Sequence, residues 1–286
     1  MKEKTLPILK TESNRDAWIQ GARNYVLVRQ NNDGGYAFAQ GLESNAQDTY
    51  YGLAILDLLK TPFSNVEQTI KWLREFVPDS LYSHYYIAKA LKLCGEDPDK
   101  NLKGYLLSRL ASMEEFGTVD VYVEVASEFE ITFTFTELIS MVSVEIDREK
   151  TIRWLLSYYN KDGGFGAHRY SNLNSTYYAV AALLNLGYPI KFLKKTLGYV
   201  RSCEKPSGGF TVVPSSSPPY MEHVYYGVST LHLLGEYARY PEKTAQFVFG
   251  CQNSNGGFAR SNLGISTFED TFYAVNILRK IGKRLR

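Results

Sequence analysis

One short pattern recurs along this chain and limits the folds that it can adopt. It reads as a polar residue, Thr or Val, and two aromatic residues, as in Asp48-Thr49-Tyr50-Tyr51 and Asp270-Thr271-Phe272-Tyr273. Further copies begin at Ser175 and His223, and a looser copy begins at Ser83. Most copies follow a Gly-Gly-aromatic turn by 12–15 residues. Self-similarity at a period of roughly 35–50 residues indicates stacked supersecondary units.

Each repeat predicts two helices of different character. The first is amphipathic, with apolar residues at helical spacing between charged ones. These first helices are expected at residues 14–30, 64–77, 98–112, 147–160, 191–203 and 241–252. The second helix is apolar on nearly every face, so it belongs in an interior. These second helices are expected at residues 48–60, 82–94, 120–145, 175–187, 222–236 and 269–282.

The six outer–inner pairs predict an all-α fold. Short connections make the apolar inner helices neighbours, and a ring allows all of them to share one interior. We therefore expect an (α/α)6 toroid, a barrel of six helical hairpins with a central apolar cavity, as one domain over residues 1–286. Its repeats would cover roughly residues 14–60, 64–94, 98–146, 147–187, 191–236 and 241–282.

The segment 113–146 fits this scheme least well. Residues 131–136 read Ile-Thr-Phe-Thr-Phe-Thr, an alternation that is typical of a strand. Closure of a six-fold ring requires a helix here, and we expect a helix in spite of the local pattern.

Composition excludes several classes of function. A net charge of +2 gives no indication of a nucleic-acid partner, and no stretch approaches the ~18 apolar residues of a membrane span. Three widely spaced cysteines argue against a disulfide framework or a structural zinc site. The start, Met1-Lys2-Glu3-Lys4, lacks the apolar stretch of a signal peptide. We therefore expect a cytoplasmic protein.

The residue that opens each copy of the pattern is the candidate for chemistry. It varies as Asp48, Ser83, Ser175, His223 and Asp270, near the starts of the inner helices. Asp and Ser at these places also suit simple helix capping, so both interpretations stay open. His is not a favoured cap. If the ring closes, His223, Asp270 and Asp48 meet on one arc of the rim, where His223 and Asp270 would be metal ligands or proton-transfer groups.

Aromatic residues dominate the recurring pattern. The 22 tyrosines offer broad rings with one polar tip, and we expect their pairs to be divided between the space between the two rings of helices and the lining of the central cavity. An aromatic lining suits an isoprenoid chain or a carbocation. Arg169 is a loop cation that would meet a diphosphate at the mouth. The candidate substrate-binding residues are Arg169, Tyr51, Tyr178, Tyr226, Tyr273 and Glu222.

The repeat resembles that of the prenyltransferase and squalene-cyclase family, which includes protein prenyltransferase β subunits and class II terpene cyclases. The resemblance is clearest where Gln252 and the Gly256-Gly257-Phe258 turn precede Asp270-Thr271-Phe272-Tyr273. It covers nearly the whole chain, strongly at residues 30–60 and 150–282. It implies an α/α toroid with a central apolar cavity.

The same resemblance implies catalytic sets that this chain does not carry intact. In protein prenyltransferases, zinc is held by an Asp-x-Cys pair and a His. Here the His position matches His223, but the pair falls on Ser175 and Tyr177. Arg169 and Tyr178 fall where the family would bind diphosphate. The cofactor stays undetermined by the sequence, with zinc and magnesium as candidates.

Class II cyclases protonate their substrate with an Asp-x-Asp-Asp motif at this helix start. Glu269 falls where the proton-donating Asp would be, and Asp270 matches the last Asp. A carboxylic acid in an apolar cavity keeps its proton because desolvation disfavours the charged form. The candidate catalytic residues are Glu269, Asp270, His223 and Asp48.

These observations predict an isoprenoid-handling enzyme of the prenyltransferase-like kind. We expect it to bind an isoprenoid or another apolar small molecule. We expect no nucleic-acid partner and no membrane segment, and the sequence is compatible with a partner subunit. The alternatives are a proton-initiated terpene cyclase of the class II type and a non-catalytic toroid that binds lipid or protein. Sugar processing on two opposed carboxylates is a further alternative.

Overall fold

A computed structural model describes residues 12–98, 100–111 and 127–282, and within them the chain forms twelve α-helices. The outer helices are α2 (Glu12–Leu27), α4 (Val66–Glu75), α6 (Lys100–Ala111), α8 (Arg148–Ser157), α10 (Thr196–Cys203) and α12 (Pro241–Gly250). The inner helices are α3 (Ala46–Leu58), α5 (Leu81–Leu93), α7 (Glu128–Val142), α9 (Leu173–Asn185), α11 (Met221–Leu233) and α13 (Phe268–Gly282).

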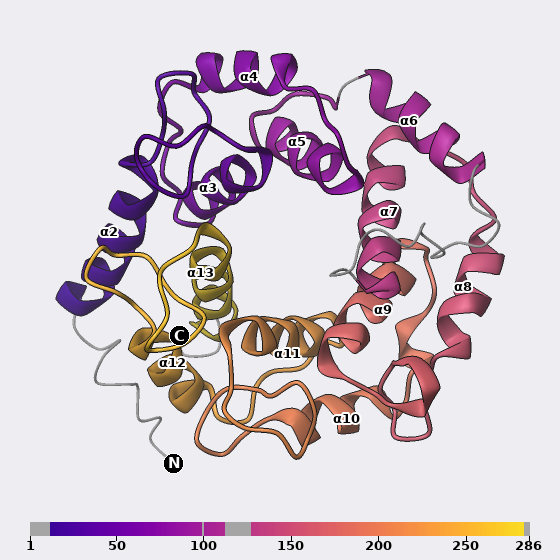
Figure 1. Cartoon of the computed structure of the whole chain (residues 1–286). Helices are drawn as coiled ribbons and strands as arrows, with labels where there is room; N and C mark the ends of the chain where they lie inside the picture. The colour runs from indigo at the N-terminus through magenta and orange to yellow at the C-terminus, as the bar shows by residue number, and fades with distance from the viewer. Residues whose placement is uncertain (1–11, 99, 112–126, 283–286) are drawn as a thin grey trace.

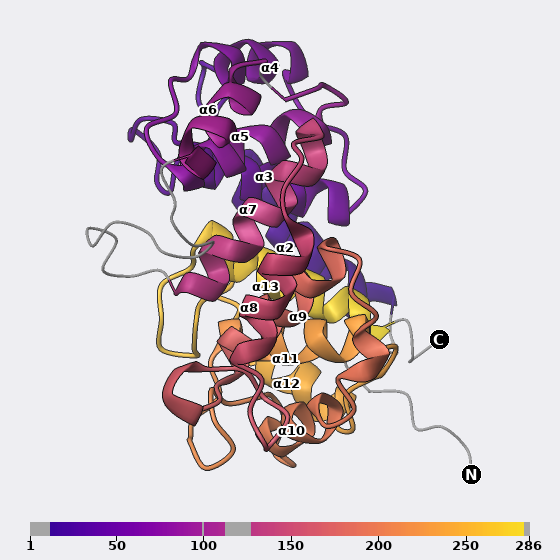
Figure 2. The same cartoon turned by 90° about the vertical axis from the view of Figure 1, so that its right-hand side faces the viewer.

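The helices form two concentric rings (Figure 1). Each inner helix contacts the next, and α13 packs against α3, so the inner ring is closed. The outer helices cover it, each packed against the inner helix that follows it in sequence. Seen from the side, the long connecting loops gather toward one rim (Figure 2). The predicted α/α toroid is confirmed. No helix within the described residues has the length and apolar character needed to cross a bilayer.

The strand-like segment 131–136 lies within helix α7. Ser127 caps this helix by accepting a hydrogen bond from the Glu130 amide. The threonines cause no loss of hydrogen bonding, since Thr132 donates to the Glu128 carbonyl at 2.7 Å. Burial of Phe135 and Leu138 then favours the helix over local strand propensity. The helix expected here is present, although residues 113–126 lie outside those that the structure describes.

The threonine of the recurring pattern has a structural role. The Tyr36 amide donates to the Thr49 hydroxyl at 2.9 Å, and the Phe165 amide donates to Thr176 at 3.0 Å. Each bond satisfies a buried amide of the Gly-Gly-aromatic turn with a side chain of the inner helix. The turn is thereby fixed on the rim at which the inner helices begin.

The first glycine of each turn joins one repeat to the next. Gly34 has a φ of 91°, and a Cβ there would lie 2.5 Å from the backbone of Gln68 at the start of the next outer helix. Gly256 meets Gly21 of α2 in the same way, and Gln252 donates to the Trp18 carbonyl at 3.3 Å. The last repeat is thus joined to the first, and this contact closes the outer ring.

Candidate functional site

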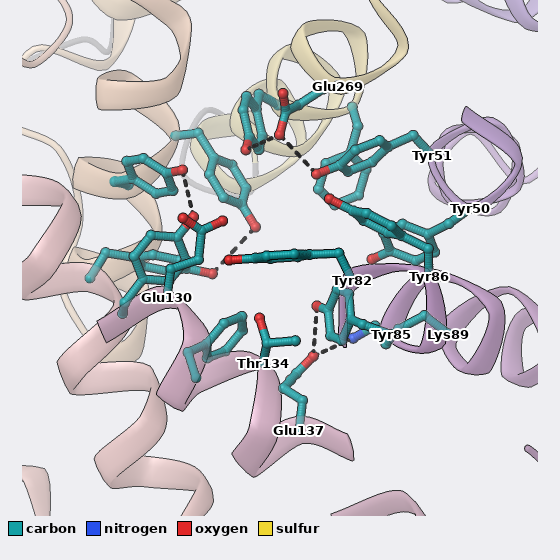
Figure 3. A pocket seen from close by; sticks show the side chains of 17 residues that line it. Tyr50, Tyr51, Tyr82, Tyr85, Tyr86, Lys89, Glu130, Thr134, Glu137 and Glu269 are labelled. Carbon is teal, nitrogen blue, oxygen red and sulfur yellow. Dashed lines mark hydrogen bonds and ion pairs between the residues drawn. The ribbon is translucent and has the colours of Figure 1, made fainter. Parts of the chain in front are cut away.

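The inner helices surround a cavity of about 250 Å³ (Figure 3). Most of its lining consists of tyrosines, supplied by all the inner helices except α7, which supplies Phe133 instead. The lining residues are Tyr50, Tyr51, Tyr82, Tyr85, Tyr86, Lys89, Glu130, Phe133, Thr134, Glu137, Tyr177, Tyr178, Tyr225, Tyr226, Glu269, Phe272 and Tyr273.

Both aromatic residues of each recurring pair line the cavity, whereas the sequence led us to expect a division between the cavity and the space between the rings. Consecutive side chains on a helix diverge by only about 100°, so both can lie on one broad face. The aromatic residues of the Gly-Gly turns do not line the cavity. Tyr36, Phe165, Phe210 and Phe258 are all fully buried.

Glu269 lies at the cavity wall, near the start of α13. Its Oε1 atom accepts hydrogen bonds from the hydroxyls of Tyr51 at 3.0 Å and Tyr273 at 2.8 Å. Two donors to one oxygen stabilise a carboxylate. Four predicted substrate-binding tyrosines, Tyr51, Tyr178, Tyr226 and Tyr273, line the same cavity.

A second carboxyl group, Glu130 of α7, faces the same cavity and was not among the predicted residues. Burial raises the pKa of Glu130, the negative charge of Glu269 adds to the rise, and a hydrogen bond with the Tyr178 hydroxyl opposes it. The spacing of Glu130 to Phe133 and Thr134 equals that of Glu269 to Phe272 and Tyr273. That spacing was the available signal, and the strand-like composition of the segment concealed it.

An ion pair also reaches the cavity. Lys89 Nζ of α5 lies 2.6 Å from Glu137 Oε2 of α7, and the Tyr85 hydroxyl donates to the same oxygen at 3.0 Å. Both charged side chains are about three-quarters buried, at 25% and 22% exposed. Lys89 is the one cation among the lining residues, and it already has an anionic partner.

Tyrosine hydroxyls extend the hydrogen bonding across the cavity. Tyr178 and Tyr226 lie 2.8 Å apart through their Oη atoms, and Tyr177 and Tyr225 lie 3.4 Å apart. Burial raises the pKa of each of these tyrosines above the usual 10.0. They are therefore neutral hydroxyls at physiological pH.

Asp48 and Asp270 are not among the residues that line the cavity. The inner helices begin two residues before these positions, so both aspartates lie in the first turn, where each carboxylate accepts a hydrogen bond from the capping residue. Asn45 donates to Asp48 at 2.7 Å, and Thr267 donates to Asp270 at 2.8 Å. Burial, with the charges of Glu269 and Glu222, raises the pKa of Asp270 to about 7.

His223 and Glu222 also lie outside the lining and form a separate rim cluster with Arg260. The guanidinium of Arg260 donates to Glu222 Oε1 at 2.7 Å through Nε. His223 Nε2 lies 3.8 Å from that same oxygen. Burial lowers the pKa of His223, so its imidazole is neutral at physiological pH.

Arg169, the predicted diphosphate ligand, is exposed and lies in the short 3-10 helix η1 (Ala167–Arg169), in the left-handed region with a φ of 67°. It does not line the cavity.

The zinc set of protein prenyltransferases does not fit these residues. Ser175 and Tyr177 occupy the positions of the Asp-x-Cys pair, and Tyr177 lies among the tyrosines that line the cavity. Nowhere in the described part of the chain do three His, Cys, Asp or Glu side chains gather closely enough to hold a metal ion. His223 and Asp270 thus lack a third ligand from these residue types.

Comparisons with known proteins agree with the geometry. A family model described as "Prenyltransferase alpha-alpha toroid domain" matches residues 4–76 and 131–286. A protein geranylgeranyltransferase-I from Candida albicans, solved in complex with GGPP, aligns with a TM-score of 0.68 at 16% identity, covering 92% of this chain and 90% of that chain.

Two further solved structures are similar. The type II terpene cyclase MstE from Scytonema aligns with a TM-score of 0.59 at 12% identity, covering 94% of this chain and 97% of that one. A protein from Actinoplanes aligns with a TM-score of 0.59 at 14% identity, with 93% and 99% covered. At such identities the similarity shows the fold alone. A search of curated proteins finds no match.

Proposed function

The chain belongs to the prenyltransferase alpha-alpha toroid family, and from that premise we propose that it is an isoprenoid-handling enzyme whose reaction begins with protonation of an alkene. One observation carries the proposal. A carboxyl group with a raised pKa, Glu130, faces a second carboxylate, Glu269, within a single tyrosine-lined cavity.

The lining favours an isoprenoid as ligand. Tyrosine rings bury apolar chain, and their faces attract a positive charge that develops on it. The volume of about 250 Å³ lies just under the usual range for small-molecule pockets, about 300–1,000 Å³. We therefore propose a short isoprenoid, of monoterpenoid or sesquiterpenoid size, rather than a long polyprene.

The charged side chains that line the cavity favour a reaction that starts with protonation of an alkene over one that starts with loss of a diphosphate. Ionisation of a prenyl diphosphate needs cations or a metal around the leaving group. Here the lining holds three carboxyl groups, and Lys89 is already paired with Glu137. Arg169 is exposed in η1 and does not line the cavity. An acid whose pKa is raised by burial and an anion that stabilises a carbocation suit the chemistry of class II cyclases.

The roles divide between the two carboxyl groups. In this proposal Glu130, with its pKa raised, donates the proton to the alkene as a general acid. The Glu269 carboxylate, which accepts hydrogen bonds from two tyrosines, stabilises the cation and removes a proton at the end. Asp48 and Asp270 then shape the helix starts through their capping bonds, and we assign no chemical step to them or to His223.

A non-catalytic toroid is the second candidate. Neither the zinc set nor a complete Asp-x-Asp-Asp motif is present, and this observation favours binding without turnover. In that case the cavity would hold an isoprenoid unchanged.

The test is product analysis with geraniol, farnesol and their diphosphates. We expect the wild type to convert an alcohol to an isomerised or cyclised product. Glu130→Gln, which keeps the shape but carries no acidic proton, should reduce the rate by at least about 10²-fold. Glu236→Gln serves as a control, because Glu236 lies far from the lining and pairs with Arg201 at 2.8 Å.

Each outcome separates the candidates. Full activity of Glu130→Gln would rule out its role as the acid. Binding of farnesol with no product from any substrate would support the non-catalytic toroid. Turnover that requires the diphosphate and an acceptor would support prenyl transfer instead.

A further inference from the structure

One side of the cavity is polar, although most of the lining is aromatic. Lys89 of α5 and Glu137 of α7 form an ion pair there at 2.6 Å. The Tyr85 hydroxyl donates a hydrogen bond to the same carboxylate at 3.0 Å. Figure 3 shows these three side chains together, on the side of the cavity away from Glu269. We call Lys89, Glu137 and Tyr85 the polar end of the cavity.

The polar end lies apart from Glu130, the carboxyl group proposed as the acid. Glu130 and Glu137 both belong to α7, and both line the cavity. Their separation of seven residues is about two helical turns, or roughly 10 Å along the helix axis. A ligand that fills the cavity therefore reaches the ion pair with one end while another part of it lies beside Glu130.

The polar end offers a ligand both hydrogen-bond donors and acceptors. An ammonium group has three N–H donors, and a carboxylate accepts through both of its oxygens. The bonds from Lys89 and Tyr85 both end on Glu137 Oε2, and Oε1 is the second acceptor of this carboxylate. An apolar chain end that covered these charged groups would give them no hydrogen bond, which is unfavourable.

We infer that the polar end binds the hydroxyl group of an isoprenoid alcohol. Such a hydroxyl accepts a hydrogen bond from Lys89 and donates one to Glu137, so it serves both members of the ion pair. The inference rests on the proposed function for the reaction that follows, although the binding itself does not.

The charges of the lining favour an alcohol over an anionic isoprenoid. A diphosphate or carboxylate at the polar end would lie beside Glu137, and Glu130 and Glu269 line the same cavity. Among the described residues of the lining, Lys89 is the one cation. Repulsion between like charges is strong where little water screens it. A neutral hydroxyl avoids this repulsion and keeps the ion pair intact.

Binding of the hydroxyl also sets the direction of the chain. With the hydroxyl at the polar end, the chain runs roughly 10 Å along α7 toward Glu130. The alkene beside Glu130 is then one far from the hydroxyl, rather than the allylic alkene next to it. The polar end thus selects the chemical class of the substrate and the double bond that receives the proton.

Isothermal titration calorimetry tests the inference without any turnover. The ligands are geraniol and farnesol, each compared with its methyl ether, which accepts a hydrogen bond but has none to donate. We expect the wild type to bind each alcohol at least about 10-fold more tightly than its ether, because the ether loses a hydrogen bond to a charged group. In the double variant Lys89→Met with Glu137→Met, which removes both charges together, this preference should fall below about 3-fold.

Arg74→Met with Glu96→Met is the matched control. These two side chains form an ion pair at 3.0 Å and do not line the cavity, so their loss should leave the preference for the alcohol unchanged. The comparison of ligands in the wild type needs no substitution, so it remains decisive whatever the stability of the variants.

Three results would overturn the inference. They are equal affinity of the wild type for alcohol and ether, an undiminished preference in the Lys89→Met, Glu137→Met variant, and tighter binding of geranyl diphosphate than of geraniol. Failure of the wild type to bind any of these ligands would overturn the proposed function as well. Equal binding of alcohol and ether would overturn this inference alone.

Discussion

The Phe258 amide donates a 2.9 Å hydrogen bond to the hydroxyl of Thr271, which joins the last Gly-Gly turn to its inner helix. Both residues are fully buried, so no water can replace the bond. Thr271→Val keeps the shape and leaves the amide without a partner, and we expect a loss of about 1–3 kcal/mol in the free energy of unfolding. Urea denaturation measures it. Ser140→Ala, at an exposed hydroxyl, should change stability by less than about 0.5 kcal/mol.

Ring closure gives a second prediction. Gly256 has a φ of 88°, and a Cβ there would meet the backbone of Gly21. We expect Gly256→Ala to lower the free energy of unfolding by at least about 1–3 kcal/mol. Gly198→Ala is the control, because Gly198 lies in α10 with open space around it. This substitution should raise the free energy of unfolding by about 0.5–1 kcal/mol. Equal effects at the two sites would contradict this account of closure.

The ion pair between Lys89 of α5 and Glu137 of α7 gives a third prediction. Lys89→Met leaves Glu137 in a largely buried place without its cation. We expect the free energy of unfolding to fall by about 1–3 kcal/mol. This is less than for a completely buried pair, because about a quarter of each side chain is exposed. The double substitution with Glu137→Met should restore much of the loss. A double variant as unstable as Lys89→Met would show that the pair has no such role.

Asp270 predicts a dependence of stability on pH. Its pKa of about 7 means that the folded protein retains a proton that the unfolded chain has released. The contribution of Asp270 to the free energy of unfolding therefore falls as the pH rises from about 4 to about 7. Asp270→Asn does not ionise. Relative to the wild type, this variant should gain about 2–4 kcal/mol in stability between about pH 4 and pH 8. If Asp270→Asn and the wild type differed in the free energy of unfolding by the same amount at about pH 4 and at about pH 8, the prediction would be contradicted.

The toroid was predictable because the signals that specify it are local and repeated. Gly34, Gly163 and Gly256 have a positive φ and pack closely against the next repeat, so they recur at the same place in each copy that has a Gly-Gly turn. Thr49, Thr176 and Thr271 recur because each satisfies the turn of its own repeat. The glycine and the threonine of one repeat lie within about fifteen residues of each other in the sequence.

The contents of the cavity were harder to predict because they depend on which residues face one another across the ring. Glu130 lies in a segment with strand-like composition, and Lys89 finds its partner 48 residues away. Helices α3 and α9 begin two residues before their predicted starts, because Asn45 and Asn172 are the capping residues. Helix α13 begins one residue before its predicted start.

In the proposed reaction, an acid in the cavity protonates an alkene of a bound isoprenoid. The most direct measurement is the mass of the product formed by the wild type in D₂O, after the protein has been equilibrated there. Protonation by Glu130 places one carbon-bound deuterium in each product molecule. A product without carbon-bound deuterium, or one that retains it at the same level in Glu130→Gln, would contradict the claim.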